Sequence, residues 1–248
     1  MTRPEQPPNL ALNLAPQLDW RDETIPVSRA FDDPYFSLAG GLDETRHVFL
    51  TGNHLPERFR DGFHIAELGF GTGLNLLATL LAHEGEGHLD YTSFEAFPMT
   101  SEDIARALSA FPETATVAGS FLDQWAVGSR TLRFPGLTAR IIIGDARDTL
   151  ATWSGKADAW FLDGFSPAKN PELWSTDLLH EVARHTAPGG TFATYTAAGH
   201  VRRALAEAGF TVTRTPGFGR KRHMSQGTFA GTRDVQLSDK SDCEDPSG

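Results

Sequence analysis

The sequence of 248 residues has very little cysteine, no long apolar run and no excess of positive charge. Its single cysteine, Cys243, can form no internal disulfide, and no Cys/His cluster has the spacing of a zinc site. No stretch is long enough to cross a bilayer as a helix, and residues 1–8 lack the apolar core of a signal peptide. These absences favour a cytoplasmic protein with no metal and no membrane partner.

The charges are distributed unevenly along the chain. The formal net charge is −10, and this sum by itself argues against a nucleic-acid partner, because binding to phosphate relies on Lys and Arg. Residues 200–223, however, hold six Lys and Arg residues and a single acid, Glu207. This basic segment has two interpretations: a solvated face, or a phosphate-binding patch that includes Arg220, Lys221 and Arg222.

The length and an apolar content of 40% suit one large domain with an appendage. Residues 1–18 are rich in proline and are expected to form a flexible arm. Residues 19–60 are expected to be an N-terminal extension that contributes a substrate lip, and within it residues 45–50 are predicted to be a strand. Residues 61–232 form the main domain in this prediction, and residues 233–248 form a disordered acidic tail.

The most informative stretch is ELGFGTGLN at residues 67–75. A short apolar run leads to Glu67, glycines follow at Gly69, Gly71 and Gly73, and apolar residues then recur at helical spacing. A strand, a glycine turn and a helix N-terminus bring backbone N–H groups close to a nucleotide-like ligand. The dinucleotide pattern is G-x-G-x-x-G, whereas this G-x-G-x-G with a preceding acid resembles the S-adenosylmethionine (SAM) methyltransferases. A glycine turn without a ligand is the alternative.

Two later strands also lead to acids. One ends in Glu95, about 20 residues beyond the glycine turn, where an acid can accept hydrogen bonds from both hydroxyls of a ribose. Both SAM and a dinucleotide cofactor predict this acid. A β-branched run at residues 137–144 leads to Asp145, which also suits the N-cap of a helix over residues 146–150. Residues 112–136, between the two strands, are predicted to be mostly loops.

A further apolar strand, residues 158–162, delivers Asp163 to its C-terminal end. Because ligands of open α/β sheets bind just outside this edge, Asp163 is a candidate catalytic residue, with a surface turn as the alternative. The loop that follows is rich in Gly and Pro and carries Phe165 and Lys169. Loops of this kind often carry function, so both side chains are candidates for contact with a substrate.

Four motifs occur in an order that resembles one known family. They are ELGFGTGLN at 67–75, SFEAFP at 93–98, DAWFLDGFSPAKNP at 158–171 and GFGRKR at 217–222. Together they closely resemble the methyltransferase part of the bifunctional tRNA 5-methylaminomethyl-2-thiouridine biosynthesis proteins, over roughly residues 25–230. The resemblance implies the α/β fold of the class I SAM-dependent methyltransferases, which is Rossmann-like. Its mostly parallel sheet would have seven strands and an antiparallel C-terminal hairpin, here within residues 61–232.

The resemblance also implies a reaction and a set of roles. The reaction is SAM-dependent methylation of the 5-aminomethyl group on the wobble uridine (2-thiouridine) of tRNA, which gives 5-methylaminomethyl. Asp163 would orient the amine, Phe165 would stack on the uracil, and Arg220, Lys221 and Arg222 would hold tRNA phosphates. The residues expected at SAM are Glu67, Gly69, Gly71, Gly73, Asn75, Glu95, Ala96, Asp145 and Ala146.

The bifunctional proteins of this family continue into a flavin-dependent oxidase domain, whereas this chain ends first. We therefore expect a stand-alone methyltransferase, with a functional link to the enzymes that install the aminomethyl group. The alternatives are a SAM-dependent methyltransferase of a small amine or a protein, an NAD-dependent oxidoreductase, and a nucleotide-binding module without catalysis. The basic segment speaks against the first alternative, and the G-x-G-x-G spacing with Asp145 speaks against the second.

Overall fold

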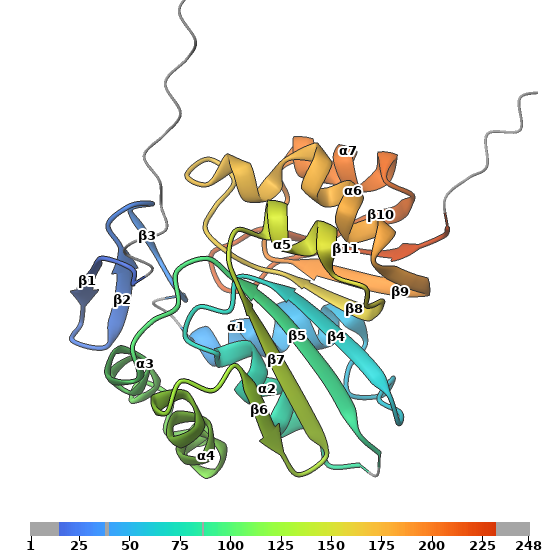
Figure 1. Ribbon diagram of the computed structural model, residues 1–248. Coiled ribbons are helices and arrows are strands. Elements are labelled where there is room, and N and C mark those ends of the chain that lie inside the picture. Colours follow the sequence, from blue (N-terminus) through green and yellow to red (C-terminus); the bar gives the residue numbers. More distant parts are fainter. Residues whose placement is uncertain (1–14, 38–39, 86, 232–248) are drawn as a thin grey trace, which may run out of the picture.

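The computed structural model describes residues 15–37, 40–85 and 87–231, and its centre is one large sheet (Figure 1). Eight strands lie in the order β10-β11-β9-β8-β4-β5-β7-β6. The parallel strands are β4 (Phe63–Leu68), β5 (Leu89–Glu95), β7 (Leu137–Ile143), β8 (Ala157–Leu162) and β9 (Thr186–Thr194). Antiparallel strands close the edges, namely β10 (Phe210–Pro216) with β11 (His223–Phe229), and β6 (Thr131–Phe134). The predicted α/β sheet with its antiparallel C-terminal pair is confirmed.

The sheet has one strand more than the seven predicted. The extra strand, β6, forms a hairpin with β7 in which Phe134 pairs with Leu137. Pro135 and Gly136 make the turn between them, and Gly136 has a φ of +73°. Proline pre-sets the first central position of such a turn, and glycine accepts the left-handed backbone of the second. The four residues of β6 are too few for an alternating pattern to stand out in the sequence.

Most of the remaining part of residues 112–136 is helical, so the prediction of loops there was wrong. The short turn η4 (Pro112–Thr114) leads into α4 (Ala115–Ala126). Ala118, Phe121 and Trp125 are buried and lie three and four positions apart, which is the spacing of one helical face. Trp125 Nε1 donates a hydrogen bond of 3.0 Å to the carbonyl of Met99 and so ties α4 to the start of α3 (Ser101–Leu108).

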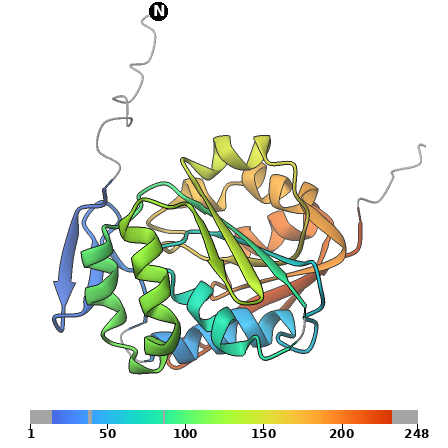
Figure 2. The same cartoon turned by 60° about the horizontal axis from the view of Figure 1, so that its bottom comes forward.

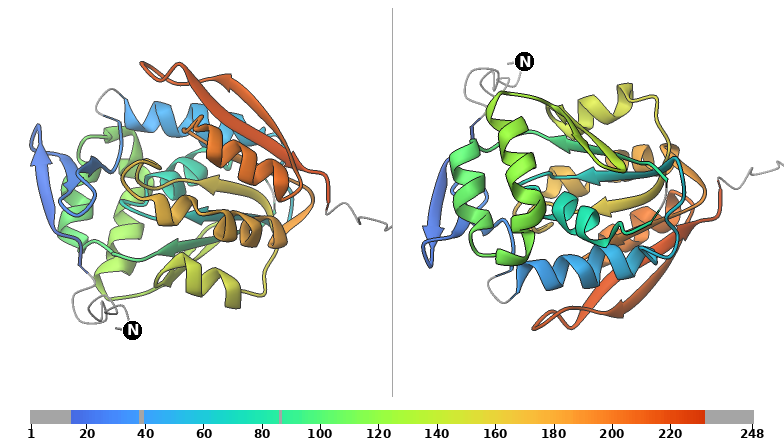
Figure 3. Two further views of the ribbon diagram at one scale, coloured as in Figure 1. Left: turned by 90° about the horizontal axis from the view of Figure 1, so that it is seen from above. Right: turned by 90° about the horizontal axis from the view of Figure 1, so that it is seen from below.

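Helices cover both faces of the sheet, as the opposite views in Figure 3 show. One face carries η5 (Pro171–Trp174), α5 (Ala146–Thr152), α6 (Thr176–Arg184) and α7 (Gly199–Glu207). The other face carries α2 (Leu74–Ala82), α3, α4 and the helical segment before β4. Trp160 and Phe161 are neighbours on β8 and are fully buried in the two different cores. Alternation along this strand therefore supplies both layers, as the pleat requires.

Residues 45–50 are helical, so the predicted strand was wrong. The segment consists of α1 (Gly41–Thr45), the π-helical turn η2 (Arg46–Leu50) and the 3₁₀ turn η3 (Thr51–Asn53). Leu42, Thr45 and Val48 are buried and lie three positions apart, which is a helical spacing. The six residues of the predicted strand are too few to show this spacing, and their aromatic and β-branched side chains favour a strand. Asn53 is fully buried, and its side chain donates to the carbonyls of Phe49 (3.0 Å) and Trp160 (3.2 Å), which fastens the segment to β8.

A small antiparallel sheet precedes this segment and lies beside α3 (Figure 2). Its strands are β1 (Leu18–Arg21), β2 (Ile25–Ser28) and β3 (Asp33–Pro34). The guanidinium group of Arg106 on α3 lies 4.0 Å from the ring centroid of Trp20 and donates to the carbonyl of Glu23. The predicted arm lies largely outside the described residues, and the predicted acidic tail, with Cys243, lies wholly outside them.

Candidate active site

A cavity of about 1400 Å³ lies where β4, β5, β7 and β8 end. The segments that follow these four strands form its floor, and residues 31–37 of the N-terminal extension and the turn between β10 and β11 form its walls. This is the edge of a parallel sheet at which ligands of α/β proteins bind. The predicted site residues that line it are Gly69, Gly71, Asn75, Glu95, Ala96, Asp145, Ala146, Asp163, Phe165, Arg220 and Lys221.

The glycine turn requires glycine for two physical reasons. Gly69 and Gly73 have φ values of +83° and +78°, a region that other residues rarely adopt. A Cβ atom on Gly69 would lie 3.2 Å from the Cα of Gly164, and one on Gly73 would lie 2.9 Å from the ring of Phe121. The turn therefore packs directly against the loop that carries Asp163. Gly73 itself is the N-cap of α2 and does not line the cavity.

Glu95 fixes the backbone around the glycine turn. One carboxylate oxygen accepts a hydrogen bond of 2.8 Å from the N–H of Gly71, and the other accepts one of 2.7 Å from the N–H of Phe97. Burial raises the pKa of Glu95, and these backbone hydrogen bonds oppose the rise. Because an ionised carboxylate can accept about four hydrogen bonds, roughly two acceptor positions remain for the hydroxyls of a ribose.

Asp145 is the N-cap of α5, as predicted. Its carboxylate accepts a hydrogen bond of 2.9 Å from the backbone N–H of Arg147. The same carboxylate forms an ion pair of 2.5 Å with the guanidinium group of Arg147. The hydrogen bond from the Arg147 side chain lowers the pKa of Asp145, which therefore stays ionised. A negative acceptor is thus held at the cavity floor, beside the backbone of Ala146.

One amide group joins the two acids that flank the glycine turn. The side-chain nitrogen of Asn75 donates to Glu67 (2.8 Å) and to Asp163 (2.9 Å). Its side-chain oxygen accepts a hydrogen bond of 3.0 Å from the hydroxyl of Thr45 in α1. The second carboxylate oxygen of Asp163 accepts a hydrogen bond of 2.8 Å from the N–H of Gly164. The orientation of the Asp163 carboxylate is therefore set by two donors.

The two acids differ in charge at neutral pH. Glu67 is fully buried and does not line the cavity, and burial raises its pKa to about 8. Burial also raises the pKa of Asp163, to about 6, but the N–H of Gly164, the amide of Asn75 and the charge of Lys221 oppose the rise. At pH 7 Glu67 is therefore mostly a neutral acid, and Asp163 is mostly a carboxylate that faces the cavity.

The loop after Asp163 is locked to the N-terminal extension. The ring of Phe165 stacks on Phe31, with centroids 4.7 Å apart. The N–H of Ser166 donates to Asp33 (2.8 Å). The ammonium group of Lys169 forms ion pairs with Asp33 and with the neighbouring Asp32. It lies 3.2 Å from a carboxylate oxygen of Asp32. Lys169 and Arg222, both predicted to contact substrate, are not among the residues that line the cavity.

Two residues that line the cavity, Glu44 and Tyr195, were not predicted from the sequence. Glu44 of α1 accepts an ion pair of 2.7 Å from Lys221, whose ammonium group also lies 4.2 Å from the ring centroid of Tyr195. Glu44 falls within the predicted substrate lip, residues 19–60, but no local pattern singles out its side chain. Tyr195 follows β9 directly, so its place at the carboxyl edge of the sheet was a usable signal.

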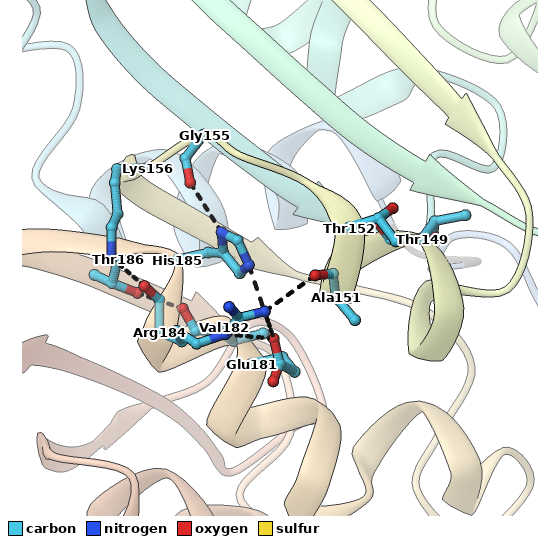
Figure 4. Close-up of polar contacts among 10 residues, drawn as sticks. All are labelled: Thr149, Ala151, Thr152, Gly155, Lys156, Glu181, Val182, Arg184, His185 and Thr186. Carbon is cyan, nitrogen blue, oxygen red and sulfur yellow. Dashed lines mark hydrogen bonds and ion pairs between the residues drawn. The ribbon is translucent and has the colours of Figure 1, made fainter.

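The opposite, amino edge of β8 is held by a separate polar cluster (Figure 4). His185 Nδ1 lies 2.9 Å from the carbonyl of Gly155, and Arg184 donates to the carbonyl of Ala151 (3.1 Å). Lys156 donates to the carbonyl of Arg184. These contacts join the loop before β8 to the end of α6.

In the part of the chain that the structure describes, no helix is long and apolar enough to cross a membrane, and no group of three His, Cys, Asp or Glu residues is placed to hold a metal.

The sequence and the fold both match known proteins. Residues 111–230 match the family model described as "S-adenosyl-L-methionine-dependent methyltransferase". The tRNA 5-methylaminomethyl-2-thiouridine biosynthesis bifunctional protein MnmC of Pseudomonas aeruginosa is 46% identical over 229 residues, which are 87% of this chain and 35% of that protein. The protein of the same name from Chromohalobacter salexigens is 45% identical over 244 residues, which are 92% and 35%. The chain thus spans about a third of the length of these relatives.

A solved structure agrees with these matches. The crystal structure of MNMC2 from Aquifex aeolicus superposes with a TM-score of 0.70 at 26% sequence identity and covers 83% of this chain and 67% of that one. The chain has the fold of the class I SAM-dependent methyltransferases, and residues 111–230 match a SAM-dependent methyltransferase family model. In sequence it is similar to one part of the bifunctional tRNA 5-methylaminomethyl-2-thiouridine biosynthesis proteins.

SAM is the cofactor of this class, and the cavity fits it. Gly69 and Gly71 line the cavity with backbone atoms, and the ring of Tyr35 lies 3.2 Å from the position that a Cβ atom on Gly71 would take. Glu95 keeps acceptor positions for a ribose, and Asp145 offers an ionised acceptor one strand further along the sheet.

Proposed function

We propose that the protein methylates the 5-aminomethyl group on the wobble uridine (2-thiouridine) of tRNA and so produces 5-methylaminomethyl. The observation that carries this proposal is the oriented carboxylate of Asp163, which faces the same cavity as the glycine turn, in a chain related to tRNA-modifying proteins. Bound SAM supplies an electrophilic methyl group on its sulfonium. The chain's own residues then have to bind the amine, orient it and expose its lone pair.

The charge of the amine is the main chemical difficulty. A free alkylamine has a pKa of about 10, like lysine, and is mostly protonated at neutral pH. Aromatic side chains such as Phe165 and Tyr195 line the cavity together with charged ones, and where the aromatic rings exclude water they favour the neutral amine. A carboxylate beside the amine favours the ammonium form, so we assign Asp163 first an orienting role, in which it accepts a hydrogen bond from the amine and fixes its lone pair.

The cofactor is assigned to the carboxyl ends of three strands. We place the methionine part against the glycine turn, beside Gly69, Gly71 and Asn75, with Gly73 behind the turn as the N-cap of α2 and Glu67 behind Asn75. The hydroxyls of the ribose would meet Glu95 and the backbone of Ala96. The adenine would meet Asp145 and the backbone of Ala146. The hydrogen bonds that already fix Glu95 and Asp145 support these placements, because they hold both carboxylates rigid.

The tRNA is assigned to the opposite wall. We propose that Phe165 stacks on the uracil at the cavity mouth and that Arg220, Lys221 and Arg222 hold phosphates of the anticodon arm. Lys169 would support this surface from behind, since its ion pairs with the extension hold the loop of Phe165 in place. Residues 19–60 then act as the substrate lip of a methyltransferase domain at residues 61–232, because residues 31–37 line the cavity.

This function has two consequences for the cell. The reaction would take place in the cytoplasm, where tRNA is modified. It would also depend on the enzymes that install the aminomethyl group, because the proposed substrate already carries that group.

The proposal is tested by the transfer of label from methyl-labelled SAM to tRNA. Bulk tRNA from cells blocked after the aminomethyl stage should accept label, and tRNA from cells that never form the aminomethyl group should not. The Asp163→Asn variant should bind SAM and transfer little or no label. SAM binding without label in either tRNA would reject tRNA as the substrate and favour a small amine or a protein.

A further inference from the structure

The ammonium group of Lys221 lies inside a ready-made cation site. It is 2.7 Å from a carboxylate oxygen of Glu44 and 4.2 Å from the ring centroid of Tyr195. The Glu44 side chain is only 10% exposed, so its carboxylate is largely withdrawn from water. Burial raises the pKa of Asp163, and the positive charge of Lys221 opposes that rise. The ammonium group of Lys221 is therefore near enough to interact electrostatically with the candidate catalytic carboxylate.

This cation site and Asp163 share one framework. The hydroxyl of Tyr195 donates a hydrogen bond of 2.9 Å to the carbonyl of Gly164, which follows Asp163 in the chain. On the other side, Glu44 is followed by Thr45, whose hydroxyl bonds to Asn75, and Asn75 in turn donates to Asp163. Both halves of the cation site are therefore tied to Gly164 and Asn75, the two residues that donate hydrogen bonds to Asp163.

A carboxylate and the face of an aromatic ring recognise an alkylammonium group by charge and by cation–π attraction. A lysine side chain ends in a CH₂–NH₃⁺ group, and a protonated aminomethyl group ends in the same atoms. We propose that Glu44 and the ring of Tyr195 form the site that binds the substrate's ammonium group on entry, and that Lys221 occupies this site in the free protein. The bound ammonium group has no lone pair, so it must release its proton to water before its nitrogen can attack the methyl group of SAM. The inference rests on the proposed function, because it takes an aminomethyl group as the substrate.

The arrangement gives Lys221 two roles. A largely buried carboxylate needs a counter-charge, and Lys221 supplies it while no substrate is bound. When the substrate's ammonium group enters, two cations compete for one carboxylate, and Lys221 must leave. It lies in the same turn as Arg220 and Arg222, so the tRNA phosphates assigned to that turn are its next partner. A free small amine brings no phosphate for Lys221, and the occupied site therefore selects against such amines.

The test measures binding of a nucleoside that has no phosphate. The protein, saturated with S-adenosylhomocysteine so that no transfer occurs, is titrated with 5-aminomethyluridine and with neutral 5-hydroxymethyluridine of nearly the same size. The variants are Lys221→Ala, Lys221→Met, which keeps the aliphatic stem, and Glu44→Gln. Lys156→Ala is the matched control, because it removes the same charge at the amino edge of the sheet (Figure 4). Binding of S-adenosylhomocysteine reports whether each variant is folded.

Removal of a competing occupant raises apparent affinity by the reciprocal of the fraction of protein whose site was free of that occupant. Both Lys221 variants should bind 5-aminomethyluridine about tenfold more tightly than wild type, with no gain for the hydroxymethyl nucleoside. Glu44→Gln should bind the amine about tenfold less tightly, since it loses a charged hydrogen bond. Lys156→Ala should match wild type.

Lys221 variants that bind the amine no more tightly than wild type would overturn the proposal. An equal gain in affinity for 5-hydroxymethyluridine would also overturn it. The same holds if neither the wild type nor any variant binds 5-aminomethyluridine more tightly than 5-hydroxymethyluridine. This assay contains neither tRNA nor methyl transfer. Its failure is therefore distinct from failure of the proposed function, which the transfer of label to tRNA decides.

Discussion

The amide of Asn75 offers the sharpest test of how the active site is built, because it donates to both Glu67 and Asp163. In an Asn75→Ala variant both acids lose a donor. Hydrogen bonds to buried or charged partners each contribute about 1–2 kcal/mol, so the free energy of unfolding should fall by about 2–4 kcal/mol. The hydrogen bond from Asn75 also lowers the pKa of Asp163, so its loss should move that pKa upward from about 6.

The kinetic consequence follows from orientation. Asp163 keeps the N–H of Gly164 but loses its second donor, so its carboxylate can rotate. A loss of about 1.4 kcal/mol of transition-state stabilisation lowers kcat tenfold, and we expect a fall of roughly 10- to 100-fold. The acid limb of the kcat–pH profile should also move to higher pH.

The assay is kcat for tRNA methylation across pH, with SAM affinity measured separately because Asn75 also lines the cofactor side of the cavity. Thr79→Val is the matched control, since Thr79 lies one turn further along α2 and its hydroxyl bonds only to the backbone carbonyl of Asn75. The control should lose stability and keep the pH profile. An Asn75→Ala variant with unchanged kcat and an unchanged acid limb would refute the reasoning.

Two further predictions concern charge. Burial raises the pKa of Glu67 to about 8. Between the ordinary pKa of a glutamate and about 8, the folded protein therefore keeps a proton on Glu67 that the unfolded chain has released. Stability should therefore fall as pH rises toward 8, and Glu67→Gln, measured by urea unfolding, should remove that fall; equal pH dependence in both proteins would contradict it. Alanine at Arg220 and Arg222 should weaken tRNA binding and reduce its salt slope by about one per lost phosphate contact, with SAM affinity unchanged. Arg133→Ala, at the opposite edge of the sheet, is the control.

The acids of the site could be predicted from the sequence because each follows its own strand. Glu95, Asp145 and Asp163 stand at the ends of apolar runs, and parallel strands end at one edge of the sheet, so their meeting follows from topology alone. The N-cap role of Asp145 was predictable for the same reason, since a cap involves only neighbouring residues. Local sequence therefore defines the floor of the cavity.

The walls of the cavity depend on contacts between distant parts of the chain. Lys221 meets Glu44 across most of the sequence, and no local pattern connects the two. Residues 45–50, which follow Glu44 in the same helical segment, were predicted as a strand from their local preference. Packing of this segment against β8 through Asn53 outweighs that preference. Lys169 reads as a cation free to meet substrate, whereas Asp32 and Asp33 hold it in the lip. Such pairings appear only in three dimensions.

The central claim is that this cavity joins a methyl group to the aminomethyl nitrogen of a tRNA uridine. The most direct test is the reaction of the protein with methyl-labelled SAM and aminomethylated tRNA, followed by digestion and mass analysis of the labelled nucleoside. The label should appear in 5-methylaminomethyl uridine or its 2-thio form, and Asp163→Asn should transfer none although it still binds SAM. Label in a different base or in a ribose, or label that appears only in small amines or proteins, would contradict it.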